Sequence, residues 1–158
     1  MDTISPEILT YEEERGKPIP SLNHVIVQTN LILALGIKYL DIYRILSELT
    51  ILFKEERKIP DLSLYNKISF QAYEDKAVYT DPPLLAIEIL SPKQKLGDLS
   101  SKCHLYFDNG VKSYWLVIPE LRSIYVFKNP EEYNAFHLKE TLTDEQMDIE
   151  LSLVDIFN

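Results

Sequence analysis

Short apolar runs bounded by turn residues dominate the middle of the chain. In the run 84–90 every residue but Glu88 is apolar, and prolines lie close on both sides. Such a run is typical of a strand that is buried on both faces of a sheet. A glutamate is costly to bury there as an anion unless a cation lies beside it. Glu88 is therefore the residue whose surroundings most need an explanation.

Helical and strand periodicities alternate along the rest of the sequence. A first helix is predicted after an N-cap at Ser21, and a second after the polar bend 93–98, with Asp98 as its N-cap and Gly110 at its C-terminal end. The packed face of the first helix is predicted to consist of Leu22, Ile26, Thr29, Leu33, Ile37 and Leu40, widened by Val25 and Ile32. The apolar face of the second is predicted to consist of Leu99, Cys103, Tyr106 and Phe107. Strands are predicted at 43–53, 59–65, 84–90, 111–118, 124–127 and 133–138.

This order of elements predicts an α/β protein with a mixed central sheet between helices and a C-terminal hairpin extension. The connection from strand 84–90 through the second helix to strand 111–118 is expected to be a right-handed βαβ unit. A chain of 158 residues is expected to form one domain, 1–158. Segment 1–20 shows no clear periodicity, and the acidic C-terminal tail has enough apolar residues to dock on the domain.

Composition narrows the class of protein. The formal net charge of −9 argues against a nucleic-acid partner, but residues 88–128 have a net charge of +2 and leave room for a polyanionic substrate. Cys103 is the single cysteine, which excludes an intrachain disulfide and a cysteine zinc site. No run approaches the ~20 apolar residues of a membrane helix. Residues 1–15 lack the apolar core of a signal peptide, so a cytoplasmic location is expected.

The candidate chemistry lies in two carboxylates on successive strands. Asp61 follows Pro60 near the start of one predicted strand, and Glu88 lies inside the next. If these strands are neighbours, the two side chains converge and offer hard oxygen ligands to Mg²⁺ or Mn²⁺. A bound cation would also explain why a carboxylate is tolerated at position 88.

Three stretches of the sequence resemble the Uma-two family, which belongs to the PD-(D/E)XK superfamily of nucleases. They are Ile59-Pro60-Asp61, then Glu88-Ile89-Leu90-Ser91-Pro92, then a run from Asp98 to Pro119 that contains Lys102, Tyr106, Gly110-Val111 and Tyr114-Trp115-Leu116-Val117. His24, which follows Pro20-Ser21, also matches the histidine of the family's first helix. The resemblance extends from about residue 20 to residue 157.

The resemblance implies a restriction-endonuclease-like core in the order α-β-β-β-α-β. It further implies that Asp61, Glu88 and the backbone carbonyl of Ile89 bind the metal ion. The superfamily's lysine, two residues after the glutamate, is replaced by Leu90 here, and Lys102 on the following helix is the matching candidate. The implied substrate is DNA, and a homodimer is one option because cutting both strands calls for two sites.

Three other residues are further candidates for the site: His24, Glu48 and Glu14. His24 could equally be a hydrogen-bonded structural residue of the first helix. Glu48, in the middle of a predicted strand, lies either on an exposed edge or against a positive group. The glutamates around Glu14 are also explained as a solvated charge run.

Two functions remain open from the sequence. The first is a metal-dependent nuclease that uses Asp61, Glu88 and Lys102. The second is a binding or regulatory protein that kept the nuclease fold and lost the chemistry. Leu90 at the lysine position and the net charge of −9 favour the second.

Overall fold

A computed structural model describes residues 10–158 of the chain. The first nine residues of segment 1–20, with most of the stretch assessed as a signal peptide, lie outside this range. Within it, a six-stranded mixed sheet has the order β1-β4-β6-β7-β8-β9. These strands are β1 (Tyr43–Ser47), β4 (Leu62–Asn66), β6 (Leu85–Ile89), β7 (Ser113–Ile118), β8 (Ser123–Asn129) and β9 (Glu132–His137). β6 and β7 are parallel, whereas the other neighbouring pairs are antiparallel.

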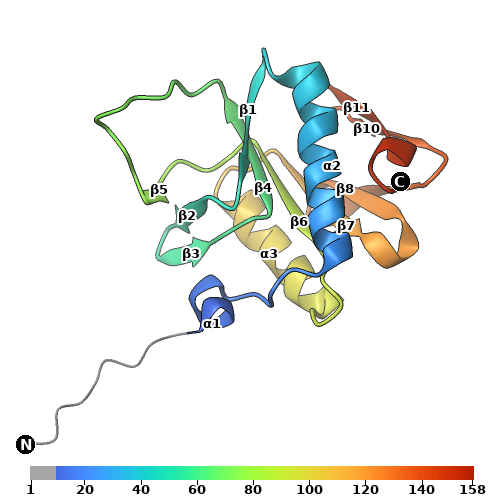
Figure 1. The fold of residues 1–158 in the computed structure, drawn as a ribbon, viewed down its shortest axis with the longest axis horizontal. Helices are drawn as coiled ribbons and strands as arrows, with labels where there is room; N and C mark the ends of the chain where they lie inside the picture. The colour runs from blue at the N-terminus through green and yellow to red at the C-terminus, as the bar shows by residue number, and fades with distance from the viewer. Residues whose placement is uncertain (1–9) are drawn as a thin grey trace, which may run out of the picture.

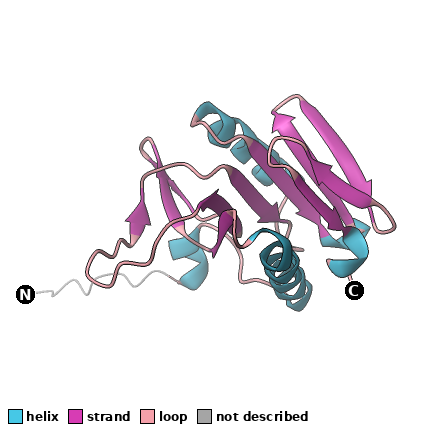
Figure 2. Cartoon of the chain, turned by 90° about the horizontal axis from the view of Figure 1, so that it is seen from above, coloured by secondary structure: helices cyan, strands magenta, loops and turns pink. Residues whose placement is uncertain are grey.

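Two helices cover opposite faces of this sheet, as Figure 2 shows from above. They are α2 (Leu22–Tyr39) and α3 (Leu96–Asp108), and α3 makes the crossover between β6 and β7. All five residues of β6 are buried. Leu85, Ile87 and Ile89 pack with α2, whereas Ala86 packs with α3. The prediction of a strand buried on both faces is confirmed, and its alternation directs Glu88 toward α3.

The predicted packing face of the first helix is wrong. α2 buries His24, Val27, Leu31 and Leu35 against the sheet. Most of the predicted stripe faces away from the core, with Leu22, Leu33, Ile37 and Leu40 exposed. The helix is apolar almost all round, so the periodicity allowed two faces. The buried face is interrupted by the polar residues His24 and Gln28, which belong to the site described below and make this face look less apolar in the sequence.

The strand predicted at 43–53 is also wrong, because the chain breaks at Glu48, whose φ is +54°. A positive φ cannot continue a strand. The segment after the break forms a separate three-stranded sheet, which consists of β2 (Thr50–Phe53), β3 (Glu56–Lys58) and β5 (Val78–Tyr79). The strand predicted at 59–65 correspondingly begins later, at Leu62.

The caps of α3 differ from the prediction as well. The N-cap is Lys95, so Asp98 lies in the first turn of the helix instead of at its cap. The C-cap is Asn109, and Gly110 follows it with a φ of +93°. Glycine adopts this left-handed conformation without a steric penalty, so the helix ends where the sequence indicated.

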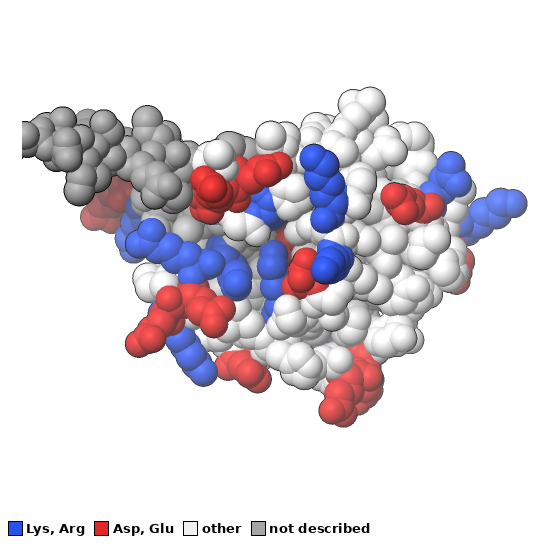
Figure 3. Space-filling model, turned by 90° about the horizontal axis from the view of Figure 1, so that it is seen from below, with Lys and Arg blue, Asp and Glu red and all other residues white. Residues whose placement is uncertain are grey.

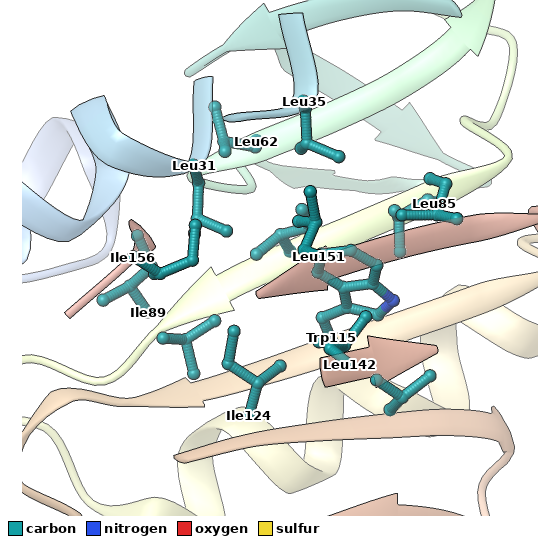
Figure 4. Packing of buried hydrophobic residues seen from close by; sticks show 14 of the residues in the cluster. Leu31, Leu35, Leu62, Leu85, Ile89, Trp115, Ile124, Leu142, Leu151 and Ile156 are labelled. Carbon is teal, nitrogen blue, oxygen red and sulfur yellow. The ribbon is translucent and has the colours of Figure 1, made fainter. Parts of the chain in front are cut away.

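The acidic C-terminal tail docks on the α2 side of the sheet as a hairpin. It contains β10 (Thr141–Asp144), β11 (Ile149–Ser152) and the 3₁₀ turn η2 (Leu153–Asp155). Figure 4 shows Leu142, Leu151 and Ile156 meeting side chains of α2 and the central sheet, Trp115 among them. Asp144 fixes the hairpin, since its carboxylate accepts hydrogen bonds from Ser113 Oγ (2.5 Å) and Trp115 Nε1 (2.7 Å).

Candidate active site

The neighbouring strands β4 and β6 bring Asp61 and Glu88 together at one end of the sheet. Their antiparallel register pairs Leu62 with Ile87, so Asp61, one residue earlier, lies beside Glu88. The Ile89 amide donates a hydrogen bond to Asp61 Oδ2 at 2.7 Å. Both carboxylates are buried, with exposures of 1% for Asp61 and 0% for Glu88. The convergence of the two carboxylates was predicted on the condition that these strands are neighbours, and the structure meets that condition (Figure 1).

Glu88 meets one hydroxyl group and two ammonium groups. Its Oε1 accepts a hydrogen bond from Tyr106 Oη at 2.7 Å and from Lys102 Nζ at 3.4 Å, both on α3. Its Oε2 lies 3.7 Å from Lys17 Nζ and has no hydrogen-bond partner in residues 10–158. Burial, and next the nearby charge of Glu88, raise the pKa of Tyr106 well above its usual value, so the hydroxyl stays a donor.

Asp61 is held as an anion by two donors from the N-terminal part of the chain. Its Oδ1 lies 2.8 Å from Lys17 Nζ and 3.2 Å from His24 Nε2. Burial acts to raise the pKa of Asp61, but the His24 hydrogen bond and the charge of Lys17 together outweigh it and lower the pKa to about 2. The backbone is held too, because Gln28 Nε2 donates to the Asp61 carbonyl at 3.1 Å. The polar face of α2 thus serves this carboxylate.

Lys17 is the site residue that sequence reasoning missed. It follows the short helix α1 (Tyr11–Arg15), whose C-cap Gly16 has a φ of +66° and turns the chain back toward the sheet. An ion pair between Arg15 Nη2 and Glu48 Oε1 (2.6 Å) ties α1 to the break between β1 and β2. Burial acts to lower the pKa of Lys17, but the charges of Glu88 and Asp61 outweigh it and raise the pKa. No periodicity or spacing in segment 1–20 pointed to this lysine.

The predicted site residues divide into two groups. Asp61, Glu88, Lys102 and His24 converge, and Ile89 joins them through its amide. Two candidates do not. The Glu48 carboxylate is paired with Arg15, whose hydrogen bond is the main cause that lowers the pKa of Glu48. Glu14 is exposed on α1, and its side chain makes no contact with the site in the described chain.

The model of one protein family matches most of the chain. The model of the Uma2 family, described as "Putative restriction endonuclease", matches residues 8–154. The chain belongs to the Uma2 family. A search of curated proteins finds no match.

The fold of this Uma2 protein also occurs in a solved structure from Anabaena variabilis, described as "a putative nuclease belonging to DUF820". The two chains are 23% identical, and the match covers 89% of this chain and 83% of the other. The TM-score of 0.76 shows that the folds are alike. The restriction-endonuclease-like fold expected from the resemblance is confirmed.

The Uma2 site fits a divalent cation in its donor set. Carboxylate oxygens are the ligands that Mg²⁺ and Mn²⁺ prefer. Glu88 Oε2 is a buried carboxylate oxygen that has no hydrogen-bond partner in the part of the chain that the structure describes, which is the kind of atom a cation would satisfy. Within residues 10–158 no group of three or more His, Cys, Asp or Glu side chains is arranged to hold a metal ion. A bound ion would therefore need a backbone carbonyl or water ligands besides the two carboxylates.

The surroundings of the site are basic and hollowed. The loop after β6 exposes Lys93 and Lys95, and the Lys102 side chain is 15% exposed beside Glu88. Seen from below, Lys and Arg side chains lie among flanking Asp and Glu side chains (Figure 3). A pocket of about 410 Å³ lies between the start of α2 and the loop after β6, and His24 and Leu90 line it. Leu90, at the motif's lysine position, packs against the α3 side of the core.

In residues 10–158 no helix is long and apolar enough to span a bilayer.

Proposed function

We propose that this Uma2 protein is a metal-dependent nuclease that hydrolyses phosphodiester bonds in DNA. Family membership supports the nuclease class. One observation supports the metal: Asp61 and Glu88 are buried side by side, and Glu88 Oε2 has no hydrogen-bond partner among residues 10–158. The basic groups at the mouth of the site suit a polyanionic substrate. A cytoplasmic location remains a prediction from the sequence.

The proposal gives each side chain a role. Asp61 and Glu88, with the Ile89 carbonyl, would hold Mg²⁺ or Mn²⁺, which supplies a polarised phosphoryl oxygen and a hydroxide nucleophile. Tyr106 orients Glu88 through the 2.7 Å hydrogen bond, and His24 orients Asp61. Lys102 is the most exposed of the buried cluster's charged groups, so its ammonium is placed to bind a phosphate oxygen.

The test is cleavage of supercoiled plasmid and of single-stranded DNA with Mg²⁺, Mn²⁺ or EDTA. Asp61→Asn and Glu88→Gln should each lose more than about a hundredfold in rate, since even groups behind metal ligands command 10–100-fold. Asp98→Asn, on the exposed start of α3, is the matched control and should cleave normally. Cleavage that survives in both site variants, or in EDTA, would refute the assignment.

We further propose that two copies associate through the outer face of α2. The exposed residues of this face from Leu22 to Ile37 include no charged side chain, and Ile37 itself is 86% exposed. Contiguous apolar surface of this kind is a mark of an interaction site. A second copy is the occupant we favour, because cutting both strands requires two active sites and the uncharged face escapes the repulsion between chains of net charge −9.

Sedimentation measures this association directly. The wild-type chain should sediment as a dimer, and Ile37→Lys should shift it to monomer. Glu74→Lys, which adds a lysine on the exposed loop between β4 and β5, should leave the dimer intact. A monomeric wild-type protein contradicts the proposal.

A second candidate function is a nuclease-fold binding protein without catalysis. The observation that favours it is that Lys17 already neutralises the carboxylates that a metal would need. DNA binding that is unchanged by EDTA, by Asp61→Asn and by Glu88→Gln, with no cleavage under any metal, would select this function over the first.

A further inference from the structure

Lys17 occupies the space that a metal ion would need. Its Nζ lies 2.8 Å from Asp61 Oδ1 and 3.7 Å from Glu88 Oε2. The ammonium thus donates a hydrogen bond to one of the carboxylates that the proposed function assigns to the metal and lies within ion-pair distance of the other. We propose that Lys17 is the resident counter-cation of this pair, and that a divalent ion enters only by displacing the Lys17 ammonium. The inference rests on the proposed function.

Because Asp61 and Glu88 are buried, a divalent ion can reach them only if a covering side chain moves away. Asp61 and Glu88 expose almost none of their surface, so neither carboxylate is open to an arriving ion. His24 on α2 and Tyr106 on α3 cover the two carboxylates, and both of these side chains are buried. Lys17 is the covering group that lies on both carboxylates at once, so its departure opens both ligands together.

Charge repulsion prevents the Lys17 ammonium and a divalent ion from lying between the carboxylates at the same time. Two carboxylates already face two ammonium groups, Lys17 and Lys102. A divalent ion added between the carboxylates would meet the Lys17 charge at contact distance in a buried site, where repulsion between like charges is strong. Lys102 approaches Glu88 Oε1 only, so it can remain while Oε2 binds the ion.

The local backbone permits the lysine to leave. Lys17 lies outside every helix and strand, and it is flanked by Pro18 and by Gly16, whose backbone is left-handed. Its segment is tied to the rest of the chain on the N-terminal side by the Arg15–Glu48 ion pair and continues into α2 at Ser21. The side chain can therefore move outward without changing a strand of the central sheet.

The first test is a Mn²⁺ titration followed by calorimetry and by thermal unfolding, on the full chain. Lys17→Met should bind Mn²⁺ about 10–100-fold more tightly than wild type, the range that groups beside metal ligands command. It should also melt at a lower temperature in EDTA and gain more from Mn²⁺. Lys95→Met, on the exposed loop, is the matched control and should bind as wild type does. Equal affinity of wild type and Lys17→Met overturns the inference and leaves the proposed function standing. No binding by either overturns both.

A second measurement needs no variant, in case Lys17→Met does not fold. Lysine acylation is mapped by mass spectrometry on the wild-type chain in EDTA and in saturating Mn²⁺. Lys17 should be protected in EDTA and should react faster in saturating Mn²⁺, whereas exposed Lys95 should react equally in both. Protection of Lys17 that persists when calorimetry shows Mn²⁺ bound would overturn the displacement.

Discussion

Two buried tyrosines on the α3 side of the sheet offer a matched test of the charge on Glu88. Tyr106 and Tyr114 both have no exposed surface, and their rings touch, with centroids 5.5 Å apart. Tyr106 Oη donates to the Glu88 carboxylate at 2.7 Å, whereas Tyr114 Oη donates to the Leu99 backbone carbonyl at 2.9 Å. Changing each tyrosine to phenylalanine removes one buried hydroxyl from the same core. The two changes differ only in the acceptor that loses its donor, a carboxylate in one case and a backbone carbonyl in the other.

The expected losses of unfolding free energy depend on whether the acceptor of each hydroxyl is charged or neutral. A hydrogen bond to a charged group contributes about 1.5–3 kcal/mol, and one between neutral groups about 0.5–1.5 kcal/mol. Tyr106→Phe should therefore lower the free energy of unfolding by about 2–3 kcal/mol, and Tyr114→Phe by about 1 kcal/mol. For a chain of this size, 1 kcal/mol corresponds to about 2–4 °C in Tm. Tyr106→Phe should thus melt roughly 4–12 °C below wild type in the absence of metal.

Urea unfolding at pH 7 with EDTA, followed by circular dichroism, measures both variants. We expect Tyr106→Phe to lose more unfolding free energy than Tyr114→Phe. If Tyr106→Phe loses the same amount or less, Glu88 is not a buried anion that depends on the Tyr106 hydroxyl.

Three further predictions concern the acid limb of stability, the C-terminal hairpin and the turn before Lys17. The folded-state pKa of Asp61, about 2, lies below its ordinary value of 3.8. The resulting stabilisation of about 2 kcal/mol is thus present above about pH 4 and is lost as pH falls toward 2. Unfolding free energies at pH 6 and pH 3 should show that Asp61→Asn lacks this acid-sensitive part. Asp144→Ala removes the acceptor of three hydrogen bonds, from Ser113 Oγ, Trp115 Nε1 and the Met147 amide, and should cost about 3 kcal/mol or more in urea unfolding, against less than about 0.5 kcal/mol for exposed Glu145→Ala. Gly16→Ala forces alanine to a φ of +66° and should cost about 1–2 kcal/mol, with faster acylation of Lys17 in EDTA. Helical Gly36→Ala, which meets nothing within 4 Å, should cost nothing; equal effects of the two changes would contradict the role of the Gly16 turn.

The sequence was sufficient for the centre of this fold because the central strands are nearly pure apolar runs. Strand 84–90 has one polar residue, and that residue led to the carboxylate pair and to the family resemblance. The pattern failed on α2 because its stripe of leucines and isoleucines is more regular than the buried face, which is interrupted by His24 and Gln28. The spacing of apolar residues reports only where hydrophobic side chains recur. Which face of α2 is buried also depends on the side chains that hydrogen-bond to Asp61.

Lys17 could not be predicted for a different physical reason. It is more than forty positions from Asp61 and Glu88 in the sequence. The left-handed Gly16 and the ion pair between Arg15 and Glu48 place its segment beside them. No local period records such a contact. Glu48 shows the same limit, since alternation with its neighbours predicted a strand residue and the ion pair with Arg15 decided its place.

The metal centre that we propose for Asp61 and Glu88 is tested most directly by an anomalous difference map from a crystal of the wild-type protein soaked in Mn²⁺. We expect a peak between the two carboxylates, with the Lys17 ammonium moved away from that position. A map without a peak there, while Lys17 still lies beside Asp61 and Glu88, would exclude this metal centre.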